Sequence, residues 1–178
     1  MFGFFKPKLS LDKLAARFAF VVQTILTPEM NPKVDEQIDG FVAAGATKET
    51  LRLELAAFNA FNDWAGMATS LQKKKLTEQQ FDQFYELFDK RLLNLAHIPV
   101  LYTACSYYFD KSLNVFINER MNVYATISAS SEPSKLVDTF CEFVCTGEPS
   151  ARLKLLVLTN YYLTAGNVAD MIAWSKIV

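Results

Sequence analysis

One histidine, His97, limits the chemistry that this chain can carry out. Zinc sites of the usual histidine-rich kinds and di-iron bundles with paired Glu-x-x-His motifs each need several histidines. His97 could still be an axial haem ligand in a pocket of phenylalanines. Its place in the stretch LAHIPV, where a helix should end, equally suits a histidine that is favoured by the helix dipole. We expect this second role, and no cofactor.

Carboxylates recur at helical spacing at Asp82, Glu86 and Asp89. Such a row could ligate a divalent cation or share a proton. No second acidic helix with matching periodicity is evident, and Lys90 stands four residues after Glu86. We interpret the row as a solvated helix face with an i,i+4 ion pair, and we predict no metal site.

The cysteines, Cys105, Cys141 and Cys145, are odd in number and lack disulfide-framework spacing. Cys141 and Cys145 would stand one helical turn apart, which is poorly aimed for a bridge. We expect buried, reduced thiols and hence a reducing compartment. Glycine-rich phosphate loops and the Gly-x-Ser-x-Gly elbow are missing from the sequence, so we predict that the protein is not an enzyme.

Two charged residues, Glu54 and Arg120, interrupt apolar helix faces. Arg120 falls within the face that contains Phe116 and Ile117, and Glu54 falls beside Phe58. A charge on an apolar face lies near a rim with its head in water, or it is paired. Rim placement is the favoured interpretation, and a buried Glu54–Arg120 pair is the alternative hypothesis.

Aromatic residues crowd the stretch YTACSYYFD at 102–110. Tyr102, Tyr108 and Phe109 share one helix side with Cys105, and Tyr107 points the other way. Aromatics at helical spacing usually belong to the core, with hydroxyl groups at its rim. The alternative is a cavity for a small apolar ligand near residues 102–124.

The elements that carry these residues are all predicted to be helices. Prolines precede apolar-periodic runs, and glycines at 45, 147 and 166 follow such runs as stop signals. No window shows sustained strand alternation bracketed by hairpin turns. The pattern predicts one all-α domain, a helical bundle of about seven helices over residues 10–178: 10–26, 32–43, 47–74, one from Thr77, 99–127 as one helix or two, 133–145 and 149–165, with a short piece from Asn167.

Helices 47–74 and 149–165 should occupy the centre of the bundle. The polar side of the first shrinks to a narrow stripe of Arg52, Asn59, Asp63 and Ser70, and the second, ARLKLLVLTNYYL, is apolar nearly all round. A helix with so little wettable surface must be surrounded by other helices.

Composition narrows the class of protein further. The chain has 178 residues, of which 51% are hydrophobic and 21% charged, with a net charge of −1. These values fit one globular domain and give no basic surplus for nucleic acid. The apolar stretch 14–26 is interrupted by Arg17 and Gln23 and is too short for a transmembrane span. With no convincing secretory signal, we expect a cytoplasmic protein.

Residues 1–9 form an apolar and basic arm with the sequence MFGFFKPKL. Phe20 projects on the polar side of helix 10–26, where a large aromatic needs cover. Phe2, Phe4 and Phe5 could cover it on the same helix or on a second copy, which would give a homodimer. They could instead grip a partner protein, or attach to a membrane surface.

We therefore expect a non-enzymatic protein that acts through a protein partner, as an adaptor, a chaperone or a toxin-neutralising protein. The predicted partner-binding residues are Phe2, Phe4, Phe5 and Phe20. The alternative is a small apolar ligand-binding bundle, or an enzyme of unfamiliar type, with its cavity near residues 102–124.

Overall fold

The computed structural model describes residues 6–27, 30–95, 105–129 and 132–178, and it confirms the all-α bundle. Each long helix has 12 to 25 residues. Over the described residues these helices are α1 (Leu11–Leu26), α2 (Pro32–Ala43), α3 (Lys48–Gln72), α4 (Glu78–Leu95), α6 (Leu113–Ser128), α7 (Pro133–Val144) and α8 (Ala151–Trp174).

Side-chain caps fix where several helices begin. The side chain of Asn31 accepts a hydrogen bond from the backbone nitrogen of Lys33 at the start of α2. At α4, the backbone nitrogen of Gln80 donates to Thr77 Oγ1 at 3.2 Å, and the backbone nitrogen of Thr77 donates to Gln80 Oε1 at 3.1 Å. This reciprocal pair of bonds is a capping box, and it starts α4 after Thr77, where the sequence predicts a helix to begin. Proline occupies the first turn of α2 and α7.

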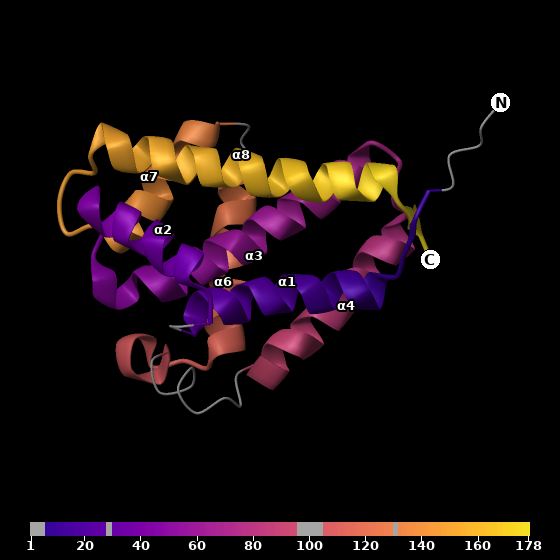
Figure 1. Ribbon diagram of the computed structural model, residues 1–178, viewed down its shortest axis with the longest axis horizontal. Coiled ribbons are helices and arrows are strands. Elements are labelled where there is room, and N and C mark those ends of the chain that lie inside the picture. The colour runs from indigo at the N-terminus through magenta and orange to yellow at the C-terminus, as the bar shows by residue number, and fades with distance from the viewer. Residues whose placement is uncertain (1–5, 28–29, 96–104, 130–131) are drawn as a thin grey trace.

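The central position predicted for residues 47–74 is confirmed. Helix α3 contacts α1, α2, α4, α6, α7 and α8, and it runs through the middle of the bundle (Figure 1). Phe58 and Phe61 are fully buried, and both rings lie against Tyr124 with centroids 5.2 Å and 5.5 Å away. The largest part of the core therefore surrounds this helix.

The polar stripe of α3 is not wetted, contrary to the sequence interpretation. Asn59, Asp63 and Ser70 are all buried. The side chains of Asn59 and Ser70 donate to backbone carbonyls one turn earlier on α3, at 2.9 Å each. The stripe faces the seam between α1 and α8, so even the polar side of α3 is covered by other helices.

The central position predicted for residues 149–165 is wrong. Helix α8 lies along the outside of the bundle, above α3 in Figure 1, and packs mainly on α3 and α7. Four of its residues are buried: Leu153, Val157, Val168 and Ile172. Its leucines and tyrosines on the opposite side face water, so the apolar composition of this helix reflects an exposed face as well as a core face.

Helix α8 also continues past Gly166, where the sequence predicts a stop. A glycine inside a helix costs only about 1 kcal/mol relative to alanine. Val168 and Ile172 continue the buried side of the helix against the core, and this burial outweighs that cost. The expected separate piece from Asn167 is therefore the second half of one 24-residue helix.

Gly66 explains how closely α3 and α8 approach. A Cβ atom at Gly66 would lie 2.6 Å from the Cβ atom of Val168 and 2.8 Å from the carbonyl oxygen of Ala165. Both distances are too short for real atoms, so only glycine fits at this crossing point.

Two smaller features differ from a pure helical pattern. Asp110, with φ of 50°, separates the helical residues 105–109 from α6, which places a break in segment 99–127. The strands β1 (Lys8–Leu9) and β2 (Lys176–Ile177) form a parallel ladder that the sequence did not predict. Each has only two residues, too few to give an alternation pattern, and their pairing joins the two ends of the chain.

Candidate functional site

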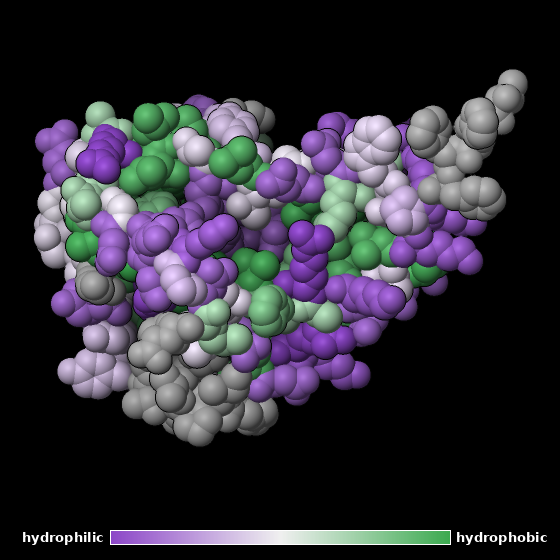
Figure 2. Space-filling model, viewed as in Figure 1, coloured by the Kyte–Doolittle hydropathy of each residue, from purple (hydrophilic) through white to green (hydrophobic). Residues whose placement is uncertain are grey.

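The outward face of α8 carries three large exposed side chains, which we call the α8 apolar stripe: Leu155, Tyr162 and Leu163. Their exposed fractions are 63%, 56% and 61%. The spacing i, i+7, i+8 places them on one face of the helix. Figure 2 shows apolar side chains gathered over the amino-terminal half of α8. The surface is therefore a patch and not a set of scattered residues.

A groove of about 440 Å³ between α7 and α8 adjoins this stripe. Pro133, Val137 and Leu158 contribute apolar surface to it, beside Leu155 and Tyr162. An ion pair between Lys154 Nζ and Asp138 Oδ1, at 2.7 Å, also lines the groove. The hydrogen bond from Lys154 to Asp138 raises the pKa of the lysine above its ordinary value, because it favours the charged ammonium form. The groove thus combines an apolar wall with fixed charges.

The start of α8 is held firmly to the bundle. The side chain of Ser150 accepts a hydrogen bond from the backbone nitrogen of Leu153 and donates to the carbonyl oxygen of Ala44 at 2.8 Å. These bonds cap α8 and tie it to the end of α2. The groove and the stripe are therefore presented on rigid elements, which lowers the entropy cost of binding.

Of the predicted partner-binding residues, the structure describes only Phe20, which lies away from this stripe on α1. Phe20 is 57% exposed on α1, so it is available at the surface. Phe2, Phe4 and Phe5 fall outside the described residues, as do His97 and Tyr102. Sequence reasoning missed the α8 apolar stripe because it treated every apolar residue of that helix as core.

Glu54 and Arg120 form the pair that was the alternative hypothesis. Arg120 Nε lies 2.9 Å and 3.1 Å from the two carboxylate oxygens of Glu54, and Arg120 Nη2 lies 2.7 Å from Oε1. The guanidinium also stacks 3.7 Å over the ring of Phe143. Burial raises the pKa of Glu54, and the bond and charge of Arg120 lower it in part. Both charges are satisfied, so the pair holds α3 to α6.

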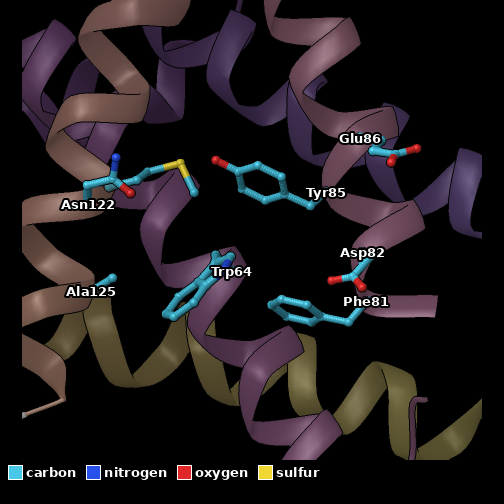
Figure 3. A pocket seen from close by; sticks show the side chains of 8 residues that line it. Trp64, Phe81, Asp82, Tyr85, Glu86, Asn122 and Ala125 are labelled. Atoms are coloured by element: carbon cyan, nitrogen blue, oxygen red, sulfur yellow. The ribbon is translucent and has the colours of Figure 1, made fainter. Parts of the chain in front are cut away.

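A second pocket, of about 400 Å³, opens between α4 and α6 beside Trp64 of α3. Figure 3 shows Trp64, Phe81 and Tyr85 as aromatic walls, with Asp82 and Glu86 along the α4 side. Asp89 instead accepts a hydrogen bond from Asn118 at 2.8 Å. The acidic row is therefore divided between this pocket and a contact with α6. Within the described ranges, no group of three potential metal ligands lies together.

Met121 and Asn122, which line this second pocket, belong to the segment 102–124 where the sequence suggested a cavity. The aromatic residues of that segment that the structure describes do not line it. Tyr107 and Tyr108 are exposed, and Phe109 stacks on Phe116 at 4.4 Å.

All three cysteines are free thiols. Burial raises the pKa of Cys105 to about 11 and that of Cys141 to about 12. A thiol with so high a pKa is protonated at neutral pH and is a weak nucleophile. Cys145 is only half-buried, which differs from the expectation of a buried residue. None of these thiols has the character of a catalytic nucleophile.

Asp63 is the buried acid that sequence reasoning missed. Its side chain is buried between α1, α3 and α8, and Oδ2 has no hydrogen-bond partner among the described residues. Burial raises the pKa of Asp63 well above its ordinary value, and the charge of Arg17 lowers it in part. The sequence does single out Asp63 as a member of the polar stripe of α3. The stripe was expected to face water, so burial of Asp63 was not predicted.

Comparison with known proteins adds no identity. No protein-family model matches the sequence, and neither curated proteins nor solved structures give a match. None of the helices in the described part of the chain combines the length and apolar content that crossing a membrane requires.

Proposed function

We propose that the protein is a non-enzymatic binding protein that presents the α8 apolar stripe and the adjoining groove to a partner protein. The observation that carries this proposal is the exposure of Leu155, Tyr162 and Leu163 on one rigid helix face. Exposed apolar side chains that adjoin an apolar groove mark interaction surfaces.

An amphipathic helix of the partner is the ligand that fits this surface best. One of its apolar side chains would enter the groove between α7 and α8, and its next turns would cover the stripe. Full burial of a leucine-sized side chain contributes about 1.5–3 kcal/mol. Lys154 and Asp138 would set the orientation of the partner through its polar residues. The free thiols support an activity in a reducing compartment, for which we propose the cytoplasm.

Site-specific photo-crosslinking in cells tests the proposal. A photo-reactive amino acid at position 155 should give one dominant covalent product, which mass spectrometry can identify. The same amino acid at Val115, an exposed apolar residue of α6, is the control position and should not give that product.

Reconstitution with the identified partner then gives the decisive measurement. The double variant Leu155→Ser/Leu163→Ser should weaken binding at least tenfold in calorimetry, and Val115→Ser should leave it unchanged. Equal binding by all three proteins would refute the proposed surface. A crosslink to a second copy of this chain would replace the heterologous partner with a homodimer through α8.

The pocket between α4 and α6 supports a second candidate function, the binding of a small molecule. Its aromatic walls and the carboxylates of Asp82 and Glu86 suit a ligand with an apolar body and a cationic amine. Native mass spectrometry of the purified protein tests this candidate. A retained ligand that is lost in Tyr85→Ala but kept in Leu155→Ser would favour it over protein binding.

A further inference from the structure

Five lysines gather at the end of the bundle where the two chain ends meet. They line a groove of about 700 Å³, which we call the terminal lysine groove: Lys6, Lys8, Lys74, Lys75 and Lys176. Gln80, Ala173 and Ser175 also line it, and none of the lining residues that the structure describes is acidic. In Figure 1 the described ends of the chain lie together at one end of the molecule.

Three separate segments bring these lysines together. The parallel ladder sets Lys8 directly beside Lys176. Lys74 and Lys75 belong to the turn between α3 and α4, where Lys74 takes a positive φ of 56°. The ammonium group of Lys6 donates to the carbonyl oxygen of Ala173 at 2.9 Å, which fixes the amino-terminal segment against the end of α8. The cluster is thus built by the fold and is not a simple basic run.

Among the residues that the structure describes, no ion pair compensates the charge in this groove. The ion pairs that join described residues use other cations: Arg52, Arg91, Lys111, Arg120, Lys135 and Lys154. These five lysines are among the 18 lysine and arginine residues of a chain whose net charge is −1, so the groove is a local concentration of positive charge on a nearly neutral chain. Like charges held together repel one another. An anionic ligand would remove that repulsion.

One exposed aromatic residue of the described chain, Trp174, flanks the same groove. Trp174 is 74% exposed, and its neighbours Ala173 and Ser175 both line the groove. In the sequence, Phe2, Phe4 and Phe5 directly precede Lys6. Tryptophan and phenylalanine next to lysines are the composition of segments that bind at the interface of a bilayer with acidic lipids. A soluble polyanion would use the lysines alone and would give no reason for an exposed tryptophan.

We propose that the terminal lysine groove and Trp174 dock this end of the bundle on the surface of a membrane that contains anionic phospholipid. The lysines contact phosphate and carboxylate groups of the lipids, and the indole ring of Trp174 enters the interfacial region. Attachment is peripheral and reversible. Leu163 lies eleven residues before Trp174, or about 16 Å along α8, so the α8 apolar stripe and the proposed docking end are separate regions of the same helix.

Vesicle sedimentation with the full chain tests the proposal. The protein should sediment with vesicles of phosphatidylcholine that contain 30% phosphatidylserine, and not with pure phosphatidylcholine. High salt should release it. Each lysine near such a surface strengthens binding roughly fivefold, so Lys74→Glu/Lys176→Glu should weaken it by about 25-fold or more.

The matched control is Lys33→Glu/Lys90→Glu, which changes the net charge equally at two exposed lysines outside the groove. This variant should lose much less affinity than the groove variant. Circular dichroism and thermal unfolding show whether both variants stay folded. Equal losses in the two variants would reduce the effect to net charge and overturn the proposal.

The fluorescence of Trp174 supplies an independent readout. Anionic vesicles should shift the emission of the wild-type protein to shorter wavelength, and Trp174→Phe should abolish that shift. No sedimentation with anionic vesicles would overturn the proposal. So would full displacement from them by polyglutamate at physiological salt, since it would identify the groove as a site for an acidic protein.

Discussion

Helices α3 and α8 look alike in the sequence but have opposite surroundings in the structure. Both are long and rich in leucine, alanine and aromatic residues. Helix α3 is covered on all sides, and even Asp63 on its polar stripe is buried. Helix α8 is covered on one side and exposes Leu155, Tyr162 and Leu163 on the other.

The difference shows what apolar composition can and cannot indicate. The argument that a helix apolar nearly all round is covered on every side assumes that all the covering residues belong to the same chain. On α8 the apolar face that this chain leaves uncovered is available to another molecule. Composition therefore distinguishes α3 and α8 from the other helices, but only α3 has the central position that composition predicts.

The largest difference in stability is expected between substitutions of core residues on α3 and substitutions of the α8 apolar stripe. Phe61→Ala should lower the free energy of unfolding by about 3–5 kcal/mol, because the side chain is fully buried on α3. Leu163→Ala should change it by less than about 0.5 kcal/mol. Urea unfolding of the two variants measures both values. Similar losses would mean that α8 is covered as completely as α3.

Breaking the ion pair between α3 and α6 should have a comparable effect. Arg120→Met leaves Glu54 buried without its partner, at a cost of about 3–5 kcal/mol. Glu54→Gln/Arg120→Met should recover a large part of this loss. Additive effects of the two substitutions in a double-mutant cycle would disprove the coupling.

The stability of the Arg120→Met variant should also depend on pH. Without Arg120, the pKa of Glu54 in the folded protein rises further above its ordinary value of 4.5. The folded state then binds a proton more strongly than the unfolded state. Stability therefore falls as the pH rises from 4.5 towards the raised pKa of Glu54 in the folded protein. Unfolding at pH 5 and pH 8 measures the difference, which should be absent from the Gln/Met double variant.

Alanine substitutions of two glycines, one on α3 and one on α8, should change stability in opposite directions. Gly66→Ala should destabilise the protein by about 1–3 kcal/mol, because the added methyl group meets Val168 and the backbone of Ala165. Gly166→Ala should stabilise it by about 0.4–1 kcal/mol, because the site is open and helical. Thermal unfolding resolves the two signs. A neutral Gly66→Ala would show that α3 and α8 pack less closely.

The smallest of these effects concerns the buried acid on α3. Asp63→Asn should raise the stability at neutral pH by about 1 kcal/mol, because it removes a buried carboxylate whose Oδ2 atom accepts no hydrogen bond from any described residue. In the wild type, the raised pKa of Asp63 means that stability falls as the pH rises above 3.8. Asp170→Asn, on the exposed side of α8, is the control and should leave the stability at neutral pH unchanged.

The helices themselves were predictable because their signals are local. Asn31, Pro32, Thr77 and Gln80 cap or start helices through contacts within a few residues. The helices predicted from residue 32 and from Thr77 therefore begin close to where the sequence indicates. Gly166 was misinterpreted because the continuation of α8 depends on the burial of Val168 and Ile172 against a distant helix.

The candidate surfaces depend on long-range arrangement, which a single sequence does not contain. The Glu54–Arg120 pair forms only because α3 packs on α6, and the terminal lysine groove forms only because the two chain ends pair. The sequence identified Glu54 and Arg120 as unusual, yet it could not choose between rim and pair. It gave no sign that Lys8 and Lys176 are neighbours.

The most direct test of the contrast between α3 and α8 is the stability of Leu155→Ser/Leu163→Ser. If the α8 apolar stripe faces water in the free protein, urea unfolding of this double variant should give a free energy within about 1 kcal/mol of the wild type. A loss of about 4 kcal/mol or more, the cost of disrupting a core, would show that the stripe is covered and would contradict its exposure on α8.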